Sequence, residues 1–313
     1  MTHTNEREAV GFTSTDGHTQ IHGEIWWPDG QARGVVQMVH GMAEHIMRYE
    51  PFARFLNAHG FVVCGHDHLG HGKSVDSPSR WGCLPARGGR DVLVGDTGRM
   101  RALMREHLDG AIPYFLFGHS MGSFVTRAYI AECGYGLAGA VICGTGHIPP
   151  QTSGAGNALA RVIAKVRGED YVSSLLGNLS VGAYAKAIEN PRTPLDWLSY
   201  DEANVDAYIA DPMCGFSFSA GGNATLTALT REVCTAECCA RVPKDLPLLY
   251  VAGDGDPVGS MGAGVRTAAQ MATDAGSRDV TCTIYEHMRH EILNEADGER
   301  VMSDIVAWME DRI

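Results

Sequence analysis

Short apolar runs recur along the chain, and longer stretches with helical spacing separate them. The runs lie at residues 35–39, 61–64, 114–117, 138–143 and 248–251. Runs of this length are too short for core helices and are typical of strands that are buried on both faces of a sheet. Buried strands that alternate with helices predict an α/β fold with a mainly parallel sheet.

Both ends of the chain add elements to this pattern. Two early strands are predicted at 10–14 and 19–27, joined by a hairpin turn at Asp16-Gly17, and a last strand at 280–285. With the central runs they make about eight strands. Helices are predicted over residues 47–59, 89–109, 120–133, 262–275 and 295–311.

The middle of the chain interrupts this rhythm. Residues 147–246 are rich in Gly, Ser, Ala and Asn and carry only short amphipathic pieces. We therefore expect a helical cap inserted into a core made of residues 1–146 and 247–313. Near the start of the cap, residues 158–166 combine apolar helical spacing with basic residues such as Arg161. Two interpretations are open, a helix packed on the core or a lid helix in transient contact with a lipid surface.

Composition narrows the class of function. The chain has 313 residues, and 25 Lys and Arg stand against 37 Asp and Glu, a formal net charge of −12. This balance argues against nucleic acid as a partner, because phosphate neutralisation needs clustered Lys and Arg. Nine scattered cysteines and a polar N-terminus without a secretory signal predict a cytoplasmic protein with free, buried thiols. No apolar stretch reaches the roughly 18 residues of a membrane-spanning helix.

A Gly-x-Ser-x-Gly motif at Gly118 to Gly122 follows a predicted strand and precedes a predicted helix. A tight turn between these elements exposes the middle residue, here Ser120, while the small flanking residues let the backbones pass. The context therefore predicts a nucleophile elbow. A serine hydroxyl is a weak nucleophile at neutral pH, so it requires a base and a group that orients the base.

The carboxylate and the histidine that such a serine requires follow it in the expected chain order. Asp256 lies after a predicted strand, and we prefer it to Asp254 because it sits deeper in the loop and precedes Pro-Val. His290 stands before an apolar pair where the last helix begins, and we prefer it to His287 as the base. The predicted catalytic residues are therefore Ser120, Asp256 and His290.

A tetrahedral intermediate also needs donors for its oxyanion, and one donor contributes on the order of 10² to 10³ in rate. The backbone N–H of Met121, directly after the serine, is the first predicted donor. The second comes from the loop after the predicted strand 35–39, where we assign the N–H of Met42. Gly41 permits the backbone geometry of this loop, and His40 braces it.

Together these motifs resemble the α/β-hydrolase superfamily, and within it the monoacylglycerol lipase and lysophospholipase-like branch. The resemblance covers nearly the whole chain. It rests on His40-Gly41-Met42-Ala43-Glu44-His45 with Arg48-Tyr49, on Asp67-His68-Leu69-Gly70-His71-Gly72-Lys73-Ser74, on the elbow, and on the cap segments 190–199 and 211–216. It implies a mostly parallel sheet with helices on both faces and a helical cap insertion, and the same triad and oxyanion N–H groups. Members cleave monoacylglycerols, lysophospholipids and small carboxylic esters.

Two clusters of possible metal ligands lack the spacing of known sites. His66-Asp67-His68 with His71 differs from the His-x-His-x-Asp-His pattern of metallohydrolases and falls where the resembling family has a structural turn. Cys234 with Cys238-Cys239 lacks the Cys-x-x-Cys spacing of a zinc site. The sequence therefore implies no metal and no cofactor.

The leading hypothesis is a serine carboxylic ester hydrolase whose small-molecule substrate is a single-chain acyl ester. We expect the monoacylglycerol lipase or lysophospholipase type, with neutral or zwitterionic glycerides as substrates. One alternative is a short-chain carboxylesterase, and another is a thioesterase or proline-type aminopeptidase. The peptidase would need an acidic group in the cap, such as Glu202, to bind a free amine. A ligand-binding protein on an inactive hydrolase scaffold is the non-enzymatic alternative, and the oligomeric state is left open.

Overall fold

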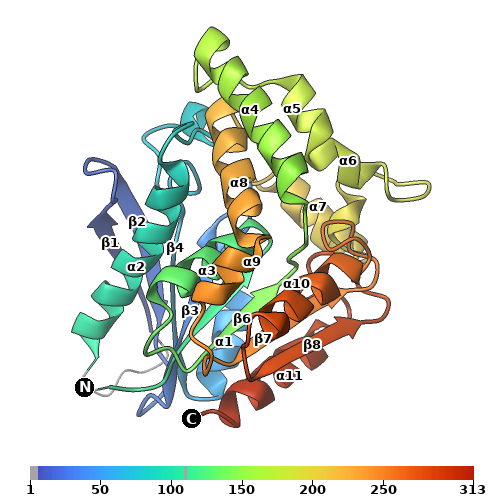
Figure 1. The fold of residues 1–313 in the computed structure, drawn as a ribbon. Helices are drawn as coiled ribbons and strands as arrows, with labels where there is room; N and C mark the ends of the chain where they lie inside the picture. Colours follow the sequence, from blue (N-terminus) through green and yellow to red (C-terminus); the bar gives the residue numbers. More distant parts are fainter. Residues whose placement is uncertain (1–5, 109–110) are drawn as a thin grey trace.

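A computed structural model describes residues 6–108 and 111–313 and contains an eight-stranded sheet in the order β1-β2-β4-β3-β5-β6-β7-β8 (Figure 1). The strands are β1 (Arg7–Thr13), β2 (Gln20–Trp26), β3 (Gly34–Val39), β4 (Phe61–His66), β5 (Tyr114–His119), β6 (Gly139–Cys143), β7 (Leu248–Gly253) and β8 (Val280–Tyr285). The pairs β1/β2 and β2/β4 are antiparallel, and the other neighbours are parallel. The predicted mostly parallel sheet is confirmed.

The predicted helices are present, and their ends differ from the prediction for local reasons. The helices concerned are α1 (Glu50–Ala58), α2 (Gly89–His107), α3 (Met121–Cys133), α10 (Ala263–Asp274) and α11 (Gly298–Glu310). The prediction for 47–59 divides into a 3₁₀ turn, η1 (Ile46–Tyr49), and α1, which has Pro51 in its first turn. The predicted end of α2 at residue 109 lies outside the described residues. The last helix begins late because the Glu295 carboxylate accepts N–H groups of Arg289 and Tyr200, which holds that segment as a loop.

Helices cover both faces of the sheet, and a separate apolar core fills each interface. Helices α2, α3 and α10 pack on one face, while α1 and α11 pack on the other. Strand β5 shows the alternation that this requires, since Leu116 belongs to the first core and Phe115 and Phe117 to the second. Because the central strands are buried on both faces, their ends are held firmly, and the loops that follow them hold the candidate site.

The chain between β6 and β7 is helical. It contains α4 (Pro150–Arg167), α5 (Ser174–Leu179), α6 (Val181–Ala185), η3 (Asp196–Leu198), α7 (Glu202–Ala210), α8 (Ala220–Val233) and α9 (Ala236–Arg241). Figure 1 shows α4 to α7 gathered beyond one end of the sheet, with α8 reaching back toward the core. Helix α8 contacts α2 and α3, and its Leu229 and Val233 join the first core. The division at residues 147 and 246 therefore remains a prediction.

The first cap helix has two different faces. Ala160 and Ala164 are buried in a small core that they share with α8, whereas Val162 and Val166 are 59% and 74% exposed. The helix packs on its neighbour through small side chains and leaves apolar ones on the surface. Within the described residues, no helix combines the length and the apolar character needed to cross a membrane.

The cysteines are free, and most of them are buried. No disulfide joins any of the nine, and six are buried. Cys133 is exposed, and Cys214 and Cys282 are partly exposed. The prediction of free thiols is therefore confirmed, whereas the prediction of burial fails for these three, since α3 ends at the surface at Cys133 and Cys282 lies on the edge strand β8.

Candidate active site

The chain reverses direction between β5 and α3, and Ser120 occupies the turn. Its φ of +53° is a left-handed conformation that a residue other than glycine adopts only when its surroundings impose it. The Ser120 N–H donates to the Cys143 carbonyl of β6 at 3.0 Å. A Cβ atom on Gly122 would overlap the carbonyl oxygen of Val39, and one on Gly118 would overlap the Gly122 backbone. Glycine is therefore required on both sides of the serine.

The predicted acid and base are brought together from two loops at the carboxyl end of the sheet. His290 Nδ1 lies 3.0 Å from Asp256 Oδ2, and both residues are almost fully buried. Asp256 also accepts the N–H of Val258 through its other oxygen, at 2.9 Å. Its carboxylate fixes the proton on His290 Nδ1, so Nε2 is left as the basic nitrogen, and Nε2 has no hydrogen-bond partner among the described residues. The alternatives Asp254 and His287 are both exposed.

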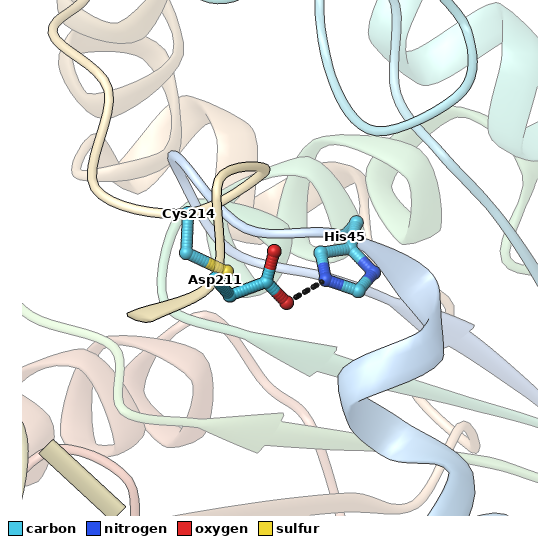
Figure 2. Close-up of side chains that lie close together, drawn as sticks. All are labelled: His45, Asp211 and Cys214. Carbon is cyan, nitrogen blue, oxygen red and sulfur yellow. Dashed lines mark hydrogen bonds and ion pairs between the residues drawn. The ribbon is translucent and has the colours of Figure 1, made fainter. Parts of the chain in front are cut away.

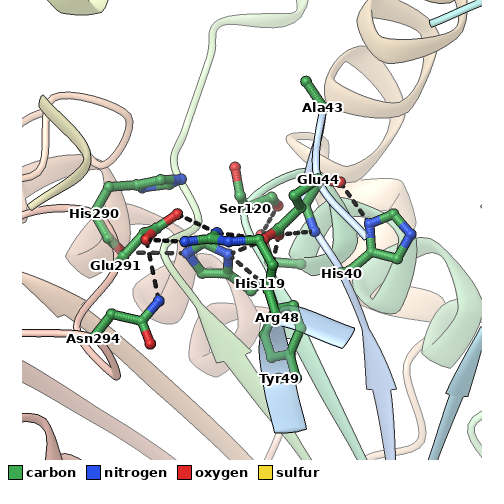
Figure 3. Close-up of polar contacts among 12 residues, drawn as sticks. His40, Ala43, Glu44, Arg48, Tyr49, His119, Ser120, His290, Glu291 and Asn294 are labelled. Atoms are coloured by element: carbon green, nitrogen blue, oxygen red, sulfur yellow. Dashed lines mark hydrogen bonds and ion pairs between the residues drawn. The ribbon is translucent and has the colours of Figure 1, made fainter. Parts of the chain in front are cut away.

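The two predicted oxyanion donors line the same pocket as Ser120 and His290. Met121 is the first residue of α3, where a backbone N–H has no partner within the helix. Within residues 6–108 and 111–313, neither the Met121 N–H nor the Met42 N–H donates a hydrogen bond. Figure 3 shows Ser120 between His290 on one side and the loop with Ala43 on the other. Two free N–H groups beside the partly exposed Ser120 can bind a developing negative charge.

A buried group of charged side chains, here called the charged cluster, adjoins Ser120 and consists of Glu44, Arg48, His119 and Glu291 (Figure 3). Arg48 donates to Glu44 at 2.8 Å and to both oxygens of Glu291 at 2.6 and 2.8 Å. Burial alone would raise the pKa of both carboxyl groups, but the Arg48 charge helps to hold both pKa values below the usual range. For Glu44, the hydrogen bond with His119 adds to this effect. The Glu291 N–H also donates to Leu198 of the cap at 2.7 Å, so the cluster links core and cap.

The hydrogen bonds of His119 are all satisfied when both ring nitrogens carry a proton. Its Nε2 lies 3.2 Å from the carbonyl oxygen of His290, which can only accept. Its Nδ1 lies 2.9 Å from the Tyr49 hydroxyl, whose own proton points to Glu44 at 2.7 Å. Burial would lower the pKa of His119, but the hydrogen bond and the charge of Glu44 raise it above its ordinary value. We therefore assign His119 as an imidazolium whose Nε2 donates to the backbone carbonyl of His290.

A second buried group, the histidine cluster, has the opposite electrostatic character. Its members are His40, His66, His68 and His71, all fully buried. Burial lowers the pKa of His66 to about 3 and that of His71 to about 4, and it lowers those of His40 and His68 well below the ordinary value. His68 donates through its backbone to His40 Nε2 at 3.0 Å, whereas both ring nitrogens of His66 lack a partner in the described part of the chain. The four side chains therefore pack as neutral imidazoles between the loop after β3 and the loop after β4.

The three side chains with metal-ligating atoms that do come together are His45, Asp211 and Cys214 (Figure 2). Their ligand atoms lie within 4.8 Å of one another, and this is the one such group that the described residues contain. His45 Nε2 already pairs with Asp211 Oδ2 at 2.8 Å. Sequence reasoning missed this contact, because its partners lie on the core loop and the cap and share no local pattern.

A pocket with about 710 Å³ of empty space opens at Ser120 between core and cap. Its walls on the cap side are apolar or aromatic and comprise Val181, Tyr184, Leu195, Trp197, Leu198, Tyr208, Phe216 and Leu226. The Trp197 ring lies 5.1 Å from the His290 ring between centroids. A smaller pocket adjoins it and is lined by the charged cluster and Asn294 together with Tyr49, Phe52, Cys143, Ile292 and Leu293. Ser120 thus faces an apolar wall suited to a hydrocarbon chain, and the charged cluster lies beside that wall.

Comparison with known proteins places this arrangement among hydrolases. The family described as serine aminopeptidase, S33, matches residues 30–297. The monoacylglycerol lipase of Mycolicibacterium smegmatis is 28% identical over 94% of each chain, and the monoglyceride lipase of Homo sapiens is 28% identical over 92% of this chain and 86% of its own. A solved structure of a thermostable carboxyl esterase from Bacillus coagulans, in complex with glycerol, superposes with a TM-score of 0.91 at 31% identity over 99% of both chains. These likenesses confirm the fold class and the resemblance predicted from the motifs.

Proposed function

This chain belongs to the serine aminopeptidase, S33 family of α/β-hydrolases, and from this premise we propose that it cleaves single-chain acyl esters, first of all monoacylglycerols. Its relatives and structural neighbours make it a hydrolase of the lipase and esterase type. The observation that carries the proposal is the position of Ser120, which faces an apolar pocket walled by the cap beside the buried His290–Asp256 pair. The monoacylglycerol and monoglyceride lipases among the relatives support the same substrate class.

In the first half of the reaction, Ser120 Oγ attacks the ester carbonyl carbon, and its proton passes to His290 Nε2. The carbonyl π electrons move onto the oxygen, where the Met42 and Met121 N–H groups stabilise the negative charge. Asp256 holds the imidazolium that has formed and does not itself take the proton. The intermediate then collapses, the ester C–O bond breaks, and His290 gives its proton to the leaving alcohol.

In the second half, water takes the place of the alcohol. His290 accepts a proton from water, hydroxide forms a bond to the acyl carbon, and the same N–H groups hold the second oxyanion. When the bond to Ser120 breaks, the serine regains its proton and the fatty acid leaves. Both halves of the reaction use His290 as the base and the Met42 and Met121 N–H groups as donors, so one set of residues is sufficient for acylation and for hydrolysis.

Two walls of the site support an acyl chain and a polar leaving group. The apolar side chains of the cap suit the acyl chain, and the charged cluster with Asn294 beside the pocket suits an alcohol with further hydroxyl groups. The acidic character of the chain, −12 in formal charge, favours a neutral or zwitterionic head group over an anionic one. A monoacylglycerol satisfies both conditions.

The aminopeptidase alternative lacks its binding group. Glu202, the acidic residue considered for a free amine, has a side chain that is 76% exposed and does not line the pocket. The two carboxylates that do reach the pocket, Glu44 and Glu291, are already paired with Arg48. Ester hydrolysis, which needs no carboxylate for an amine, fits these walls better.

We further propose that the cap rests transiently on a lipid surface. Val162 and Val166 on α4, and Leu175 and Leu179 on α5, are apolar residues with exposed fractions of 52% or more, and α4 and α5 lie at the end of the molecule beyond the sheet. Exposed basic residues accompany them on α4. Co-sedimentation with phosphatidylcholine vesicles tests this contact, and the double variant V166S/L179S should bind several-fold less while hydrolysing a soluble ester normally. Equal binding by the double variant and the wild type would exclude contact through this face.

The decisive experiment compares the wild type with Ser120→Ala on a panel of substrates. The panel comprises nitrophenyl esters of increasing chain length, a monoacylglycerol, a lysophosphatidylcholine and a prolyl amide. We expect efficient monoacylglycerol hydrolysis by the wild type and a loss of at least about 10³ in rate for the variant. Ser303→Ala, on the exposed face of α11, is the matched control and should be unchanged.

The panel also separates the alternatives. Turnover of acetyl or butyryl esters alone would favour the short-chain carboxylesterase and overturn the glyceride proposal. Faster cleavage of the prolyl amide would favour the aminopeptidase. Activity that survives in Ser120→Ala would remove the serine from the mechanism altogether.

A further inference from the structure

The cap touches the loop that carries the Met42 N–H through polar contacts as well as apolar ones. The Tyr208 hydroxyl, on α7, donates to the Ala43 carbonyl oxygen at 2.6 Å. The Gly215 N–H donates to the same oxygen at 2.9 Å. Between them in the chain, Asp211 pairs with His45 at 2.8 Å (Figure 2). We call residues 208–215 the cap strap and residues 40–45 the oxyanion loop.

Ala43 holds a conformation that needs support. Its φ is +55°, in the left-handed region, which an alanine adopts only at a cost in conformational energy. Both hydrogen-bond donors to its carbonyl among the described residues belong to the cap strap. The contacts that hold Ala43 in this conformation therefore come from a segment far away in the sequence, and they exist only while the cap lies on the core.

The other end of the loop is held by the core itself. The Gly41 N–H donates to Glu44, which is fixed in turn by Arg48 and by the Tyr49 hydroxyl. Met42 thus lies between a core anchor at Gly41 and a cap anchor at Ala43. The peptide that carries the Met42 N–H is itself held at its carbonyl, since His40 Nδ1 lies 2.8 Å from the Gly41 oxygen. The anchors at Gly41 N–H and at the Ala43 carbonyl limit its rotation further from either side.

We propose that Tyr208 is a positioning residue of the cap that keeps the Met42 N–H directed at the developing oxyanion through its hydrogen bond to Ala43. The inference rests on the proposed ester hydrolase mechanism and deepens it. Seating of the cap and completion of the oxyanion hole then become one event. When the cap strap leaves Ala43, the hole retains only the Met121 donor.

Tyr208→Phe tests this role, because the ring stays while the hydroxyl is removed. The ring is 6% exposed and packs against the Arg48 guanidinium at 4.7 Å, and these contacts remain in the variant. We expect kcat to fall about 10- to 100-fold, less than the loss of a whole oxyanion donor, with KM within about two-fold of the wild type. Tyr171→Phe, a cap tyrosine that packs on Arg167, is the matched control and should keep wild-type kinetics.

A pair of inhibitors separates positioning from substrate contact, since Tyr208 also lines the pocket. A trifluoromethyl ketone with an acyl-like chain forms a tetrahedral adduct and therefore requires the oxyanion hole. An uncleavable ether analogue of a monoacylglycerol does not. We expect Tyr208→Phe to weaken the ketone in parallel with kcat/KM and to leave the affinity of the ether within about two-fold. Equal weakening of both ligands would assign Tyr208 to substrate binding and overturn the proposal.

A second variant removes the ion pair between Asp211 and His45 and leaves both hydrogen bonds to the Ala43 carbonyl in place. Asp211→Ala should lower kcat in the same direction by a smaller factor, because Tyr208 and Gly215 still hold Ala43. Wild-type kcat in Tyr208→Phe, or a fall in its unfolding temperature large enough to explain the lost activity, would overturn the inference. Failure here is distinguishable from failure of the proposed function. Activity that survives in Ser120→Ala would overturn the proposed mechanism, whereas wild-type kcat in Tyr208→Phe together with an inactive Ser120→Ala would overturn this inference alone.

Discussion

The charged cluster and the histidine cluster are both buried beside the oxyanion loop, yet they differ in almost every physical respect. In the first, each carboxylate is matched by Arg48 or by the protonated His119. In the second, the imidazoles carry no charge because burial lowers their pKa values. One cluster keeps its charges and pairs them, whereas the other loses its charges.

This difference decides how each cluster responds to change. A buried charge that loses its partner is left without compensation, so every member of the charged cluster depends on the others. A neutral imidazole has no charge to leave uncompensated at neutral pH, and His66 has no hydrogen bond to lose, but each imidazole gains a proton when the chain unfolds in acid. The charged cluster should therefore be sensitive to substitution and the histidine cluster to pH.

The largest expected effect is that of Arg48→Met. The substitution leaves Glu291 buried without its counter-charge and Glu44 with His119 alone, and we expect the free energy of unfolding to fall by about 3–5 kcal/mol. Urea unfolding of the two proteins measures this difference. The control is Arg300→Met, which breaks an exposed ion pair with Asp297 and should cost less than about 1 kcal/mol. A cost as small as that for Arg48→Met would mean that the cluster is not held together by charge.

The pH dependence of stability gives the second effect. The folded pKa values of the histidine cluster lie below the ordinary 6.5, so the unfolded chain binds more protons and stability falls as pH drops below about 6.5. Each histidine contributes a slope of up to about 1.4 kcal/mol per pH unit. His119 has the opposite sign, because its raised pKa adds stability that is lost as pH rises above 6.5. Urea unfolding between pH 5 and pH 8 should therefore show a maximum near neutrality, and a curve that keeps rising toward acid would contradict the neutral state of the cluster.

The smallest expected effect is that of His66→Phe at pH 7.5. Neither nitrogen of His66 has a partner in the described residues, and the ring already packs against Phe12 and His68 at centroid distances of 5.6 and 5.1 Å. We expect a change in unfolding free energy within about 1 kcal/mol, together with a shallower loss of stability in acid. His68→Phe is the comparison and should cost more, because its Nε2 bonds the His40 carbonyl at 3.1 Å. A larger cost for His66 than for His68 would reverse this ranking.

Local pattern was sufficient for much of the fold. The short apolar runs predicted the five central strands, because a strand buried on both faces leaves no room for polar residues. Gly118 and Gly122 predicted the elbow because only glycine fits against the neighbouring backbone there. Helix ends were less predictable, as the late start of α11 shows, since contacts between Glu295 and distant N–H groups set that boundary.

The candidate site divides in the same way. Ser120 could be found from its motif, and Asp256 and His290 from chain order after strands whose carboxyl ends share one edge of the sheet. Arg48 and Glu291 are 243 positions apart, and no periodicity relates two residues at such a distance. Arg48 belongs to one of the motifs that carry the resemblance, but nothing in the sequence indicates that it meets Glu291.

The sequence by itself determined the order of strands and helices, the elbow and the residue types of the proposed triad, because these depend on short-range sterics and on the period of apolar positions. Only the tertiary structure decided that His119 is held as an imidazolium and that His40, His66, His68 and His71 are neutral, because charge depends on which groups surround each side chain. The same holds for the contact between Tyr208 and Ala43. It joins segments 165 positions apart, and the packing of cap on core alone brings them within hydrogen-bond distance.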